Sequence, residues 1–190
     1  MIRGLRGLMR LGAVAWCVAW GGMTLFRHRR NWSQAQLADA VQHWSKAMLQ
    51  AMGVRVQWQG QPLDGPVLWV ANHIAWLDIL VLHSVRYARF IAKSEVHRWP
   101  LIGPMAAAAG TLFIERASRR DALRVVHQIA ESLNRGDTVA VFPEGTTSLG
   151  DTVLPFHANL LQAAVTTQVP IQPVLIRYID DQGARAPHVQ

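Results

Sequence analysis

Short apolar runs alternate with amphipathic stretches from residue 54 onward. Val54–Gln59 alternates apolar and polar positions, which predicts a strand. Continuous apolar runs predict buried strands at Val67–Ala71, Arg89–Lys93, Thr111–Arg116, Thr138–Phe142 and Ile171–Tyr178. Helical spacing predicts helices between them at 76–85, 119–134 and 158–167. This alternation predicts an α/β fold with a mostly parallel sheet flanked by helices.

The predicted helix over 119–134 carries apolar residues at helical spacing. Leu123, Val126, Ala130 and Leu133 fall on one stripe, and Gly136 follows the end of the pattern. This spacing and the glycine after it make 119–134 the clearest predicted helix of the chain.

The N-terminal region has a different pattern. An apolar run of 16 residues, 11–26, lies between Arg3, Arg6 and Arg10 on one side and the basic cluster 27–30 on the other. The run is shorter than the roughly 20 residues that span a bilayer. No small-residue cleavage site precedes the basic cluster, which disfavours a signal peptide. A spanning helix and a helix lying in one leaflet both stay open, and basic residues at both ends favour the second on the cytoplasmic face.

A second helix is predicted directly after this segment. Ser33 and Gln36 form a capping-box pattern, and Gly53 is a natural helix end. The apolar stripe between them suits either core packing or a lipid surface; it consists of Leu37, Val41, Trp44, Met48 and Met52. We therefore expect a membrane-associated helical region over 1–53 and an α/β domain over 54–190.

Composition limits the classes of function. The chain has 190 residues, 51% hydrophobic and 16% charged, and a net charge of +7. Such apolarity excludes a disordered chain, and the single Cys17 excludes an internal disulfide. A basic chain suits nucleic acid, anionic lipid or phosphorylated substrates. Because the arginines gather beside an apolar helix rather than on a recognition element, a nucleic-acid partner is the least favoured of these.

His73 and Asp78 stand out as polar residues within an apolar stretch, "VLWVANHIAWLDILVL". On a regular helix, five residues turn the chain by about 500°, so these side chains would diverge by about 140°. They meet only if His73 lies in the turn before a helix and Asp78 in its first turns. A carboxylate would then hold the imidazole proton on one nitrogen and leave the other as a base. The alternative is a buried structural histidine.

Three further polar stretches end predicted strands, where open α/β sheets place their sites. They are "GTLFIER" (110–116), "FPEGTTS" (142–148) and "VPIQPV" (169–174). The turn at Pro143 and Gly145 presents Glu144, followed by the hydroxyls of Thr146, Thr147 and Ser148. The chain contains no P-loop, GxGxxG or GxSxG motif and no cluster of metal ligands.

Together these stretches resemble the glycerolipid acyltransferase family, the 1-acyl-sn-glycerol-3-phosphate acyltransferase-like enzymes that acylate lysophosphatidic acid. The NH-x4-D motif is matched by Asn72, His73 and Asp78, and G-x-x-F-I-x-R by Gly110, Phe113, Ile114 and Arg116. F-P-E-G-T-x-S is matched by 142–146 and Ser148, V-P-I-x-P-V by 169–174, and a K-x-E segment by "AKSEV" at 92–96.

The resemblance implies an activity and a site. His73, oriented by Asp78, would be the catalytic base for transfer of a fatty acyl group from acyl-CoA or acyl-carrier protein to 1-acyl-glycerol-3-phosphate, giving phosphatidic acid. Residues implied to bind substrate are Lys93, Arg116, Glu144, Gly145 and Thr146. No metal or other cofactor is implied. The expected location is the cytoplasmic face of a membrane, the inner membrane of a bacterium.

Departures from the family pattern keep the acceptor open. Ala75 and Thr147 stand where Ser and Arg are common, and His157 and Ala158 replace a basic residue and Gly. Another lysolipid, such as lyso-ornithine lipid, and a non-catalytic membrane lipid-binding role therefore remain alternatives. Family members commonly extend further, so we expect either a C-terminally incomplete domain or a short member.

Overall fold

The computed structural model describes residues 2–28, 31–115, 119–184 and 186. The chain divides into two compact units. The first comprises residues 1–61, 79–87 and 95–111, and the second 62–78, 88–94 and 112–190.

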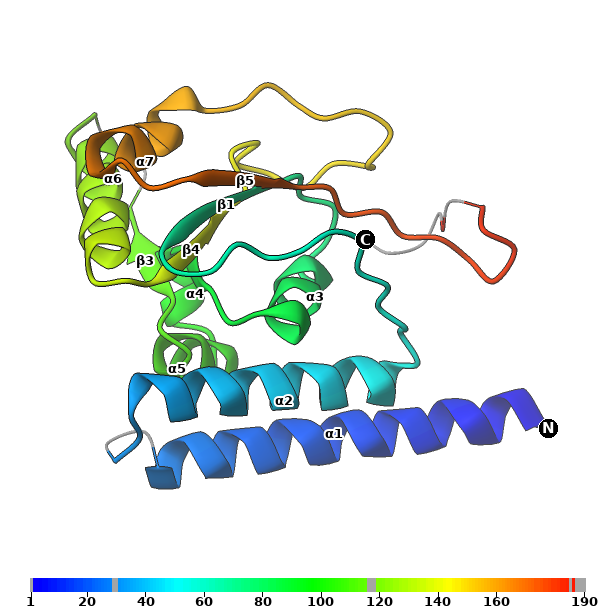
Figure 1. Cartoon of the computed structure of the whole chain (residues 1–190). Helices are drawn as coiled ribbons and strands as arrows, with labels where there is room; N and C mark the ends of the chain where they lie inside the picture. Colours follow the sequence, from blue (N-terminus) through cyan, green and yellow to red (C-terminus); the bar gives the residue numbers. More distant parts are fainter. Residues whose placement is uncertain (1, 29–30, 116–118, 185, 187–190) are drawn as a thin grey trace. The chain divides into compact units, whose positions relative to one another are not determined.

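A helical hairpin forms the N-terminal part of the first unit (Figure 1). Helices α1 (Ile2–His28) and α2 (Gln34–Met52) run antiparallel, and the indole Nε1 of Trp44 donates to the carbonyl of Cys17 at 2.9 Å. Gly21 packs against the Trp44 ring, because a Cβ at Gly21 would collide with that Nε1. Small size at Gly21 therefore permits the close packing of the two helices.

The ends of α2 follow the sequence prediction. Ser33 accepts from the backbone N–H of Gln36, whose side chain accepts in return from the backbone N–H of Ser33. Gly53 ends the helix with φ of 78°, a left-handed conformation that glycine adopts without strain. The guanidinium of Arg10 lies against Gly53, where a cation is stabilised by the carbonyl end of the helix.

Helix α1 differs from α2 in what it exposes. On α2, Val41 and Met48 of the predicted stripe are buried. Large apolar side chains of α1 are exposed: Leu8, Met9, Leu11, Trp16, Trp20, Met23 and Phe26. By length and composition, residues 7–28 could cross a membrane. The first unit also contains α5 (Ile102–Ala108), most of α3 (Leu77–Val85) and an irregular stretch that follows α2.

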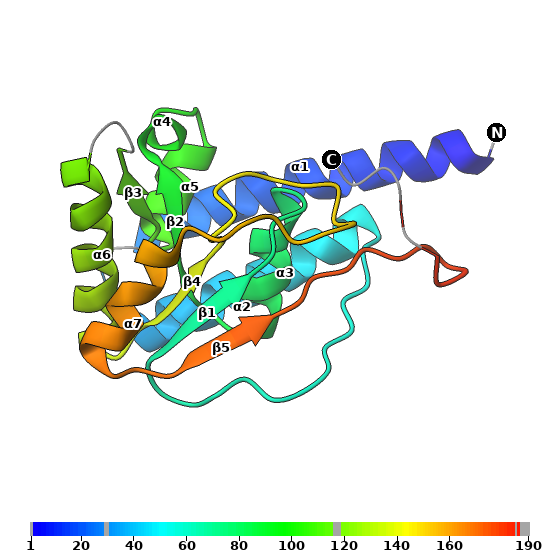
Figure 2. The same ribbon diagram turned by 90° about the horizontal axis from the view of Figure 1, so that it is seen from above.

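A five-stranded sheet organises the second unit (Figure 2). Its strands are β1 (Val67–Ala71), β2 (Arg89–Lys93), β3 (Leu112–Ile114), β4 (Thr138–Val141) and β5 (Ile171–Val174). The strand order is β3-β2-β4-β1-β5, and every neighbouring pair is parallel. The predicted parallel α/β sheet is therefore confirmed, and the carboxyl ends of all five strands meet at one edge.

Helices α6 (Arg119–Asn134) and α7 (Gln162–Thr167), with the 3₁₀ turn Ala158–Leu161, build a core with one face of the sheet. From α6, Ile129 and Leu133 enter this core beside Val139 and Val141 of β4. The predicted helix bounds are confirmed. Of the four residues on the apolar stripe, Leu133 is buried, Val126 and Ala130 pack partly buried against the core, and Leu123 is 72% exposed.

The predicted strand at 54–59 is also wrong, because this segment is irregular. Alternating polarity stabilises a strand only where a neighbouring strand supplies hydrogen bonds, and these residues pair with none of the five strands. The strands predicted at 111–116 and 171–178 are real but shorter. Two short helices carried no sequence prediction, α4 (Ser94–His97) and α5.

Candidate active site

His73 and Asp78 meet across the turn from β1 into α3. His73 follows the strand, Asp78 lies in the first turn of the helix, and Nδ1 of His73 is 2.8 Å from Oδ2 of Asp78. The geometric condition drawn from the sequence is thus met. A carboxylate in the first turn is also stabilised by the positive end of the helix dipole.

Asp78 is fully buried, with an exposed fraction of 0%, and its charge is met by four donors. Besides the imidazole, Oδ2 accepts the backbone N–H groups of Ile74 at 2.7 Å and Ala75 at 3.0 Å. Oδ1 accepts the phenol O–H of Tyr178 at 2.6 Å. Such a set compensates the desolvation of a buried charge and fixes the plane of the carboxylate.

The arrangement assigns the tautomer of His73. A carboxylate only accepts hydrogen bonds, so Nδ1 carries the proton and the lone pair of the neutral ring lies on Nε2. The ring stacks on Phe142 with centroids 4.1 Å apart, and 19% of the side chain is exposed. His73 therefore presents a fixed base to the surface of the second unit.

The peptide of His73 is held on both sides by the segment after β4. Its N–H donates to Oε1 of Glu144 at 2.8 Å, and its carbonyl accepts from the N–H of Ser148 at 2.8 Å and from the Ser148 hydroxyl at 3.3 Å. The other carboxylate oxygen of Glu144 accepts the N–H of Leu154 at 2.9 Å. Glu144 is buried, so this geometry supports a role in positioning His73. Its contact with substrate stays a prediction.

Gly145 and Thr146 continue the same segment. Gly145 has φ of 72° and donates its N–H to the carbonyl of Phe142 at 3.1 Å, which closes the tight turn that presents Glu144. Thr146 is exposed. Both residues lie in the chain between Glu144 and Ser148, which bond the His73 peptide. Their roles in substrate binding stay predictions.

Lys93 ends β2 at the same edge of the sheet. It is exposed, and its Cα pairs in register with that of Ile114, the last residue of β3. Arg116, the other predicted phosphate-binding cation, lies outside the described residues.

The sequence indicated no role for Asn72 or Tyr178, and the structure shows what each of them contacts. The Asn72 side chain accepts the N–H of Ile176 at 2.7 Å and donates to its carbonyl at 3.1 Å, so it braces the turn after β1. Tyr178, which carried no signal in the sequence, reaches Asp78.

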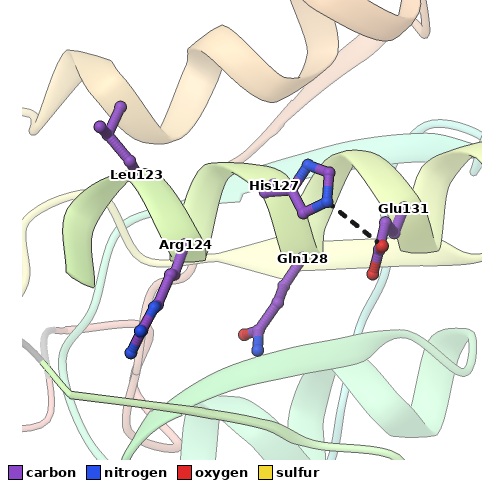
Figure 3. Close-up of a pocket in the computed structure, with 5 residues that line it drawn as sticks. All are labelled: Leu123, Arg124, His127, Gln128 and Glu131. Atoms are coloured by element: carbon purple, nitrogen blue, oxygen red, sulfur yellow. Dashed lines mark ion pairs between the residues drawn. The ribbon is translucent and has the colours of Figure 1, made fainter. Parts of the chain in front are cut away.

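Metal ligands do not gather in the described part of the chain, where no group of three His, Cys, Asp or Glu side chains is placed to hold an ion. An open hollow of about 460 Å³ lies on the outer surface of α6 and is lined by Leu123, Arg124, His127, Gln128 and Glu131 (Figure 3). His127 and Glu131 form an ion pair there, with Nε2 and Oε1 3.3 Å apart (Figure 3). None of the predicted site residues that the structure describes lines this hollow, so it is separate from the His73–Asp78 site.

Comparison with known proteins identifies the family. A family model described as Acyltransferase matches residues 46–177. The chain belongs to the Acyltransferase family. The match includes the turn between β1 and α3 and the segment after β4, and the resemblance drawn from the motifs is confirmed.

Relatives in the family carry two kinds of name. A lyso-ornithine lipid O-acyltransferase of Pseudomonas aeruginosa is 40% identical over 148 residues, 77% of this chain and 57% of that protein. A 1-acyl-sn-glycerol-3-phosphate acyltransferase of Neisseria gonorrhoeae is 44% identical over 119 residues, 63% of this chain and 47% of that protein. The chain thus spans about half the length of these relatives.

A solved acyltransferase has the same fold. The crystal structure of the 1-acyl-sn-glycerophosphate acyltransferase PlsC from Thermotoga maritima superposes with a TM-score of 0.69 at 27% identity. The superposition covers 90% of this chain and 73% of that one.

Proposed function

We propose that this acyltransferase moves a fatty acyl group from an acyl thioester to the free hydroxyl of a lysolipid. The observation that carries the proposal is the pair of His73 and buried Asp78, which leaves Nε2 of the imidazole as a base at the carboxyl edge of the sheet. Ligands of open α/β sheets bind at this edge.

The reaction follows from the tautomer of His73. Nε2 removes the proton of the acceptor hydroxyl as its oxygen attacks the thioester carbonyl carbon, and the resulting imidazolium is stabilised by Asp78. The tetrahedral intermediate collapses with cleavage of the carbon–sulfur bond. The imidazolium returns its proton to the thiolate, so the products are an ester and a free thiol. No acyl-enzyme is needed because the donor is already activated.

The first candidate acceptor is 1-acyl-glycerol-3-phosphate, which would become phosphatidic acid. Its phosphate requires cations near the site. Lys93 is the last residue of β2, and Arg116 follows β3 in the chain. Acyl-CoA and acyl-carrier protein are both suitable thioester donors.

Lyso-ornithine lipid is the second candidate acceptor. Four relatives 37–42% identical to this chain are named for that activity. This acceptor has no phosphate, which fits the presence of Thr147 where the family pattern commonly has Arg, a phosphate-binding side chain.

Association with a membrane would bring the site to a lipid acceptor. We propose that α1 lies in one leaflet on the cytoplasmic face of a bacterial inner membrane. Contacts of Trp44 with Cys17 and of Gly53 with Arg10 tie α2 to α1 at separate points along their length. If α1 crossed the bilayer, α2 would take the exposed Asp39 and His43 with it, at a high cost.

The test is transfer of a labelled acyl group from acyl-CoA and from acyl-carrier protein to lysophosphatidate and to lyso-ornithine lipid. We expect the purified chain to acylate one of these acceptors, and His73→Ala to lower kcat by about 10² to 10⁴. The same variant should still bind to anionic vesicles.

His127→Ala is the matched control, because this histidine is on the exposed face of α6. It should keep the native rate. Native turnover by a folded His73→Ala chain would refute the mechanism. Vesicle binding with no transfer to any acceptor would favour the non-catalytic alternative.

A further inference from the structure

The pairing of β1 with β5 is continued by a side chain after the strands end. In the sheet the last paired residues are Ala71 and Val174. The next residue, Asn72, then forms two hydrogen bonds with the backbone of Ile176, one to its N–H and one to its carbonyl. Both residues are buried. The amide of Asn72 thus replaces a strand partner and fixes the course of the chain after β5.

Two residues later, this segment places the Tyr178 hydroxyl beside the Asp78 carboxylate. The O–H of Tyr178 donates to Oδ1 of Asp78 at 2.6 Å, across 100 residues of sequence. Burial and the neighbouring Asp78 charge raise the pKa of Tyr178 far above its usual value, so the phenol stays protonated and acts as a donor. Oδ2 faces the imidazole, so the two carboxylate oxygens have different partners.

We propose that Tyr178 is a positioning residue for the His73–Asp78 pair and that Asn72 acts through it by holding the Ile176–Tyr178 segment. This inference rests on the proposed function, in which His73 is the base. A donor on Oδ1 fixes the rotation of the carboxylate, so that Oδ2 points at Nδ1 of His73. It also draws negative charge toward Oδ1 and away from the imidazole.

Loss of the phenol hydroxyl would therefore have a defined electrostatic consequence. The negative charge of Asp78 would concentrate on Oδ2, and the protonated imidazole would be stabilised. Among the described residues, two other titratable groups hydrogen-bond to the pair: Tyr178 from the segment after β5, and Glu144, which accepts the His73 N–H from the segment after β4. Glu144 does not contact Asp78 in the described hydrogen bonds, so Tyr178→Phe changes the environment of that carboxylate alone.

The experiment compares Tyr178→Phe with Tyr87→Phe. These are the two tyrosines of the chain, and Tyr87 donates its hydroxyl to a backbone carbonyl, that of Ala109, at 2.9 Å. The full chain in detergent is labelled on histidine, and the His73 ring resonance is identified by its loss in His73→Gln. We expect Tyr178→Phe to move the midpoint of the His73 titration by NMR to higher pH, by about half a pH unit or more. Tyr87→Phe should leave it unchanged.

This measurement needs no turnover, so it is independent of the proposed activity. If transfer is observed, Tyr178→Phe should lower kcat about tenfold near neutral pH, with KM changed less than twofold, and shift the acidic limb of the rate profile upward. The double variant with Asn72→Ala should lose no more kcat than the worse single variant. Both substitutions act through the one hydrogen bond from Tyr178 to Asp78.

An unchanged His73 titration in a folded Tyr178→Phe chain would overturn the inference, whether or not the chain transfers acyl groups. Strictly additive rate losses in the double variant would overturn the role given to Asn72. Absence of transfer with a shifted titration would refute the proposed function and leave the positioning contact standing.

Discussion

Glu144 binds the backbone of His73, with Oε1 2.8 Å from the histidine nitrogen, although the two residues are 71 positions apart. The catalytic candidate is therefore held by its side chain through Asp78 and by its peptide through Glu144. This double attachment makes the segment after β4 a support for the base, and not solely a surface for substrate.

Removing the carboxylate of Glu144 should lower the rate more than it changes substrate binding. Glu144→Ala leaves the N–H groups of His73 and Leu154 unpaired, at about 1–3 kcal/mol of stability. We expect a lower kcat with KM changed less than twofold, and a smaller loss in Glu144→Gln, which keeps one acceptor. Steady-state kinetics and thermal unfolding measure both effects. A raised KM at native kcat would instead indicate direct substrate contact, and Glu131→Ala on α6 is the control.

The packing face of α6 can be tested with two variants of one helix. Ile129 is fully buried in the core and Leu123 is 72% exposed. We expect Ile129→Ala to lower the free energy of unfolding by about 2–5 kcal/mol and Leu123→Ala to change it by about 0.5 kcal/mol or less. Denaturant unfolding of the two variants gives the comparison. Equal losses would contradict the observed face.

Adjacent glycines in α1 should respond in opposite directions to the same substitution. A Cβ at Gly21 would collide with the Trp44 indole, whereas nothing lies within 4 Å of a Cβ at Gly22. Gly21→Ala should separate α1 from α2 and lower the melting temperature. Gly22→Ala should be neutral or stabilising by up to about 1 kcal/mol, because alanine favours helix. If Gly21→Ala were as stable as Gly22→Ala, the close contact at Trp44 would be wrong.

Burial of His83 should make the fold sensitive to acid. Desolvation lowers the pKa of His83 from its ordinary value of 6.5 to about 3, so the ring stays neutral in the folded chain. Below pH 6.5 the unfolded chain binds the extra proton, and stability falls toward pH 3 by up to about 1.4 kcal/mol per pH unit.

His83→Phe removes that titration and keeps a ring to stack on Tyr87. Unfolding free energies measured from pH 7 to pH 4 should therefore fall less steeply in this variant. His43→Phe, at an exposed position of α2, should follow the native curve. Identical curves for His83→Phe and the native chain would place the acid sensitivity elsewhere.

Local pattern was enough to predict the parallel sheet, the limits of α6, the capping of α2 and the meeting of His73 with Asp78. Each of these predictions used residues that are near one another in the chain. The signals were apolar runs, a Ser–Gln pair, and a turn that brings a histidine to the first turn of a helix. The segment around Glu144 could likewise be located from the sequence, because its polar side chains follow a predicted buried strand.

Only the tertiary structure decided what those side chains touch. It turned Glu144 toward the His73 peptide, brought Tyr178 to Asp78, left Leu123 of α6 exposed, and left Val54–Gln59 without a strand partner. These outcomes depend on contacts between segments tens of residues apart, and the periodicity of a single segment carries no information about its partners. The sequence determined which groups stand at the strand ends, and the packing of the sheet determined which of them support the base.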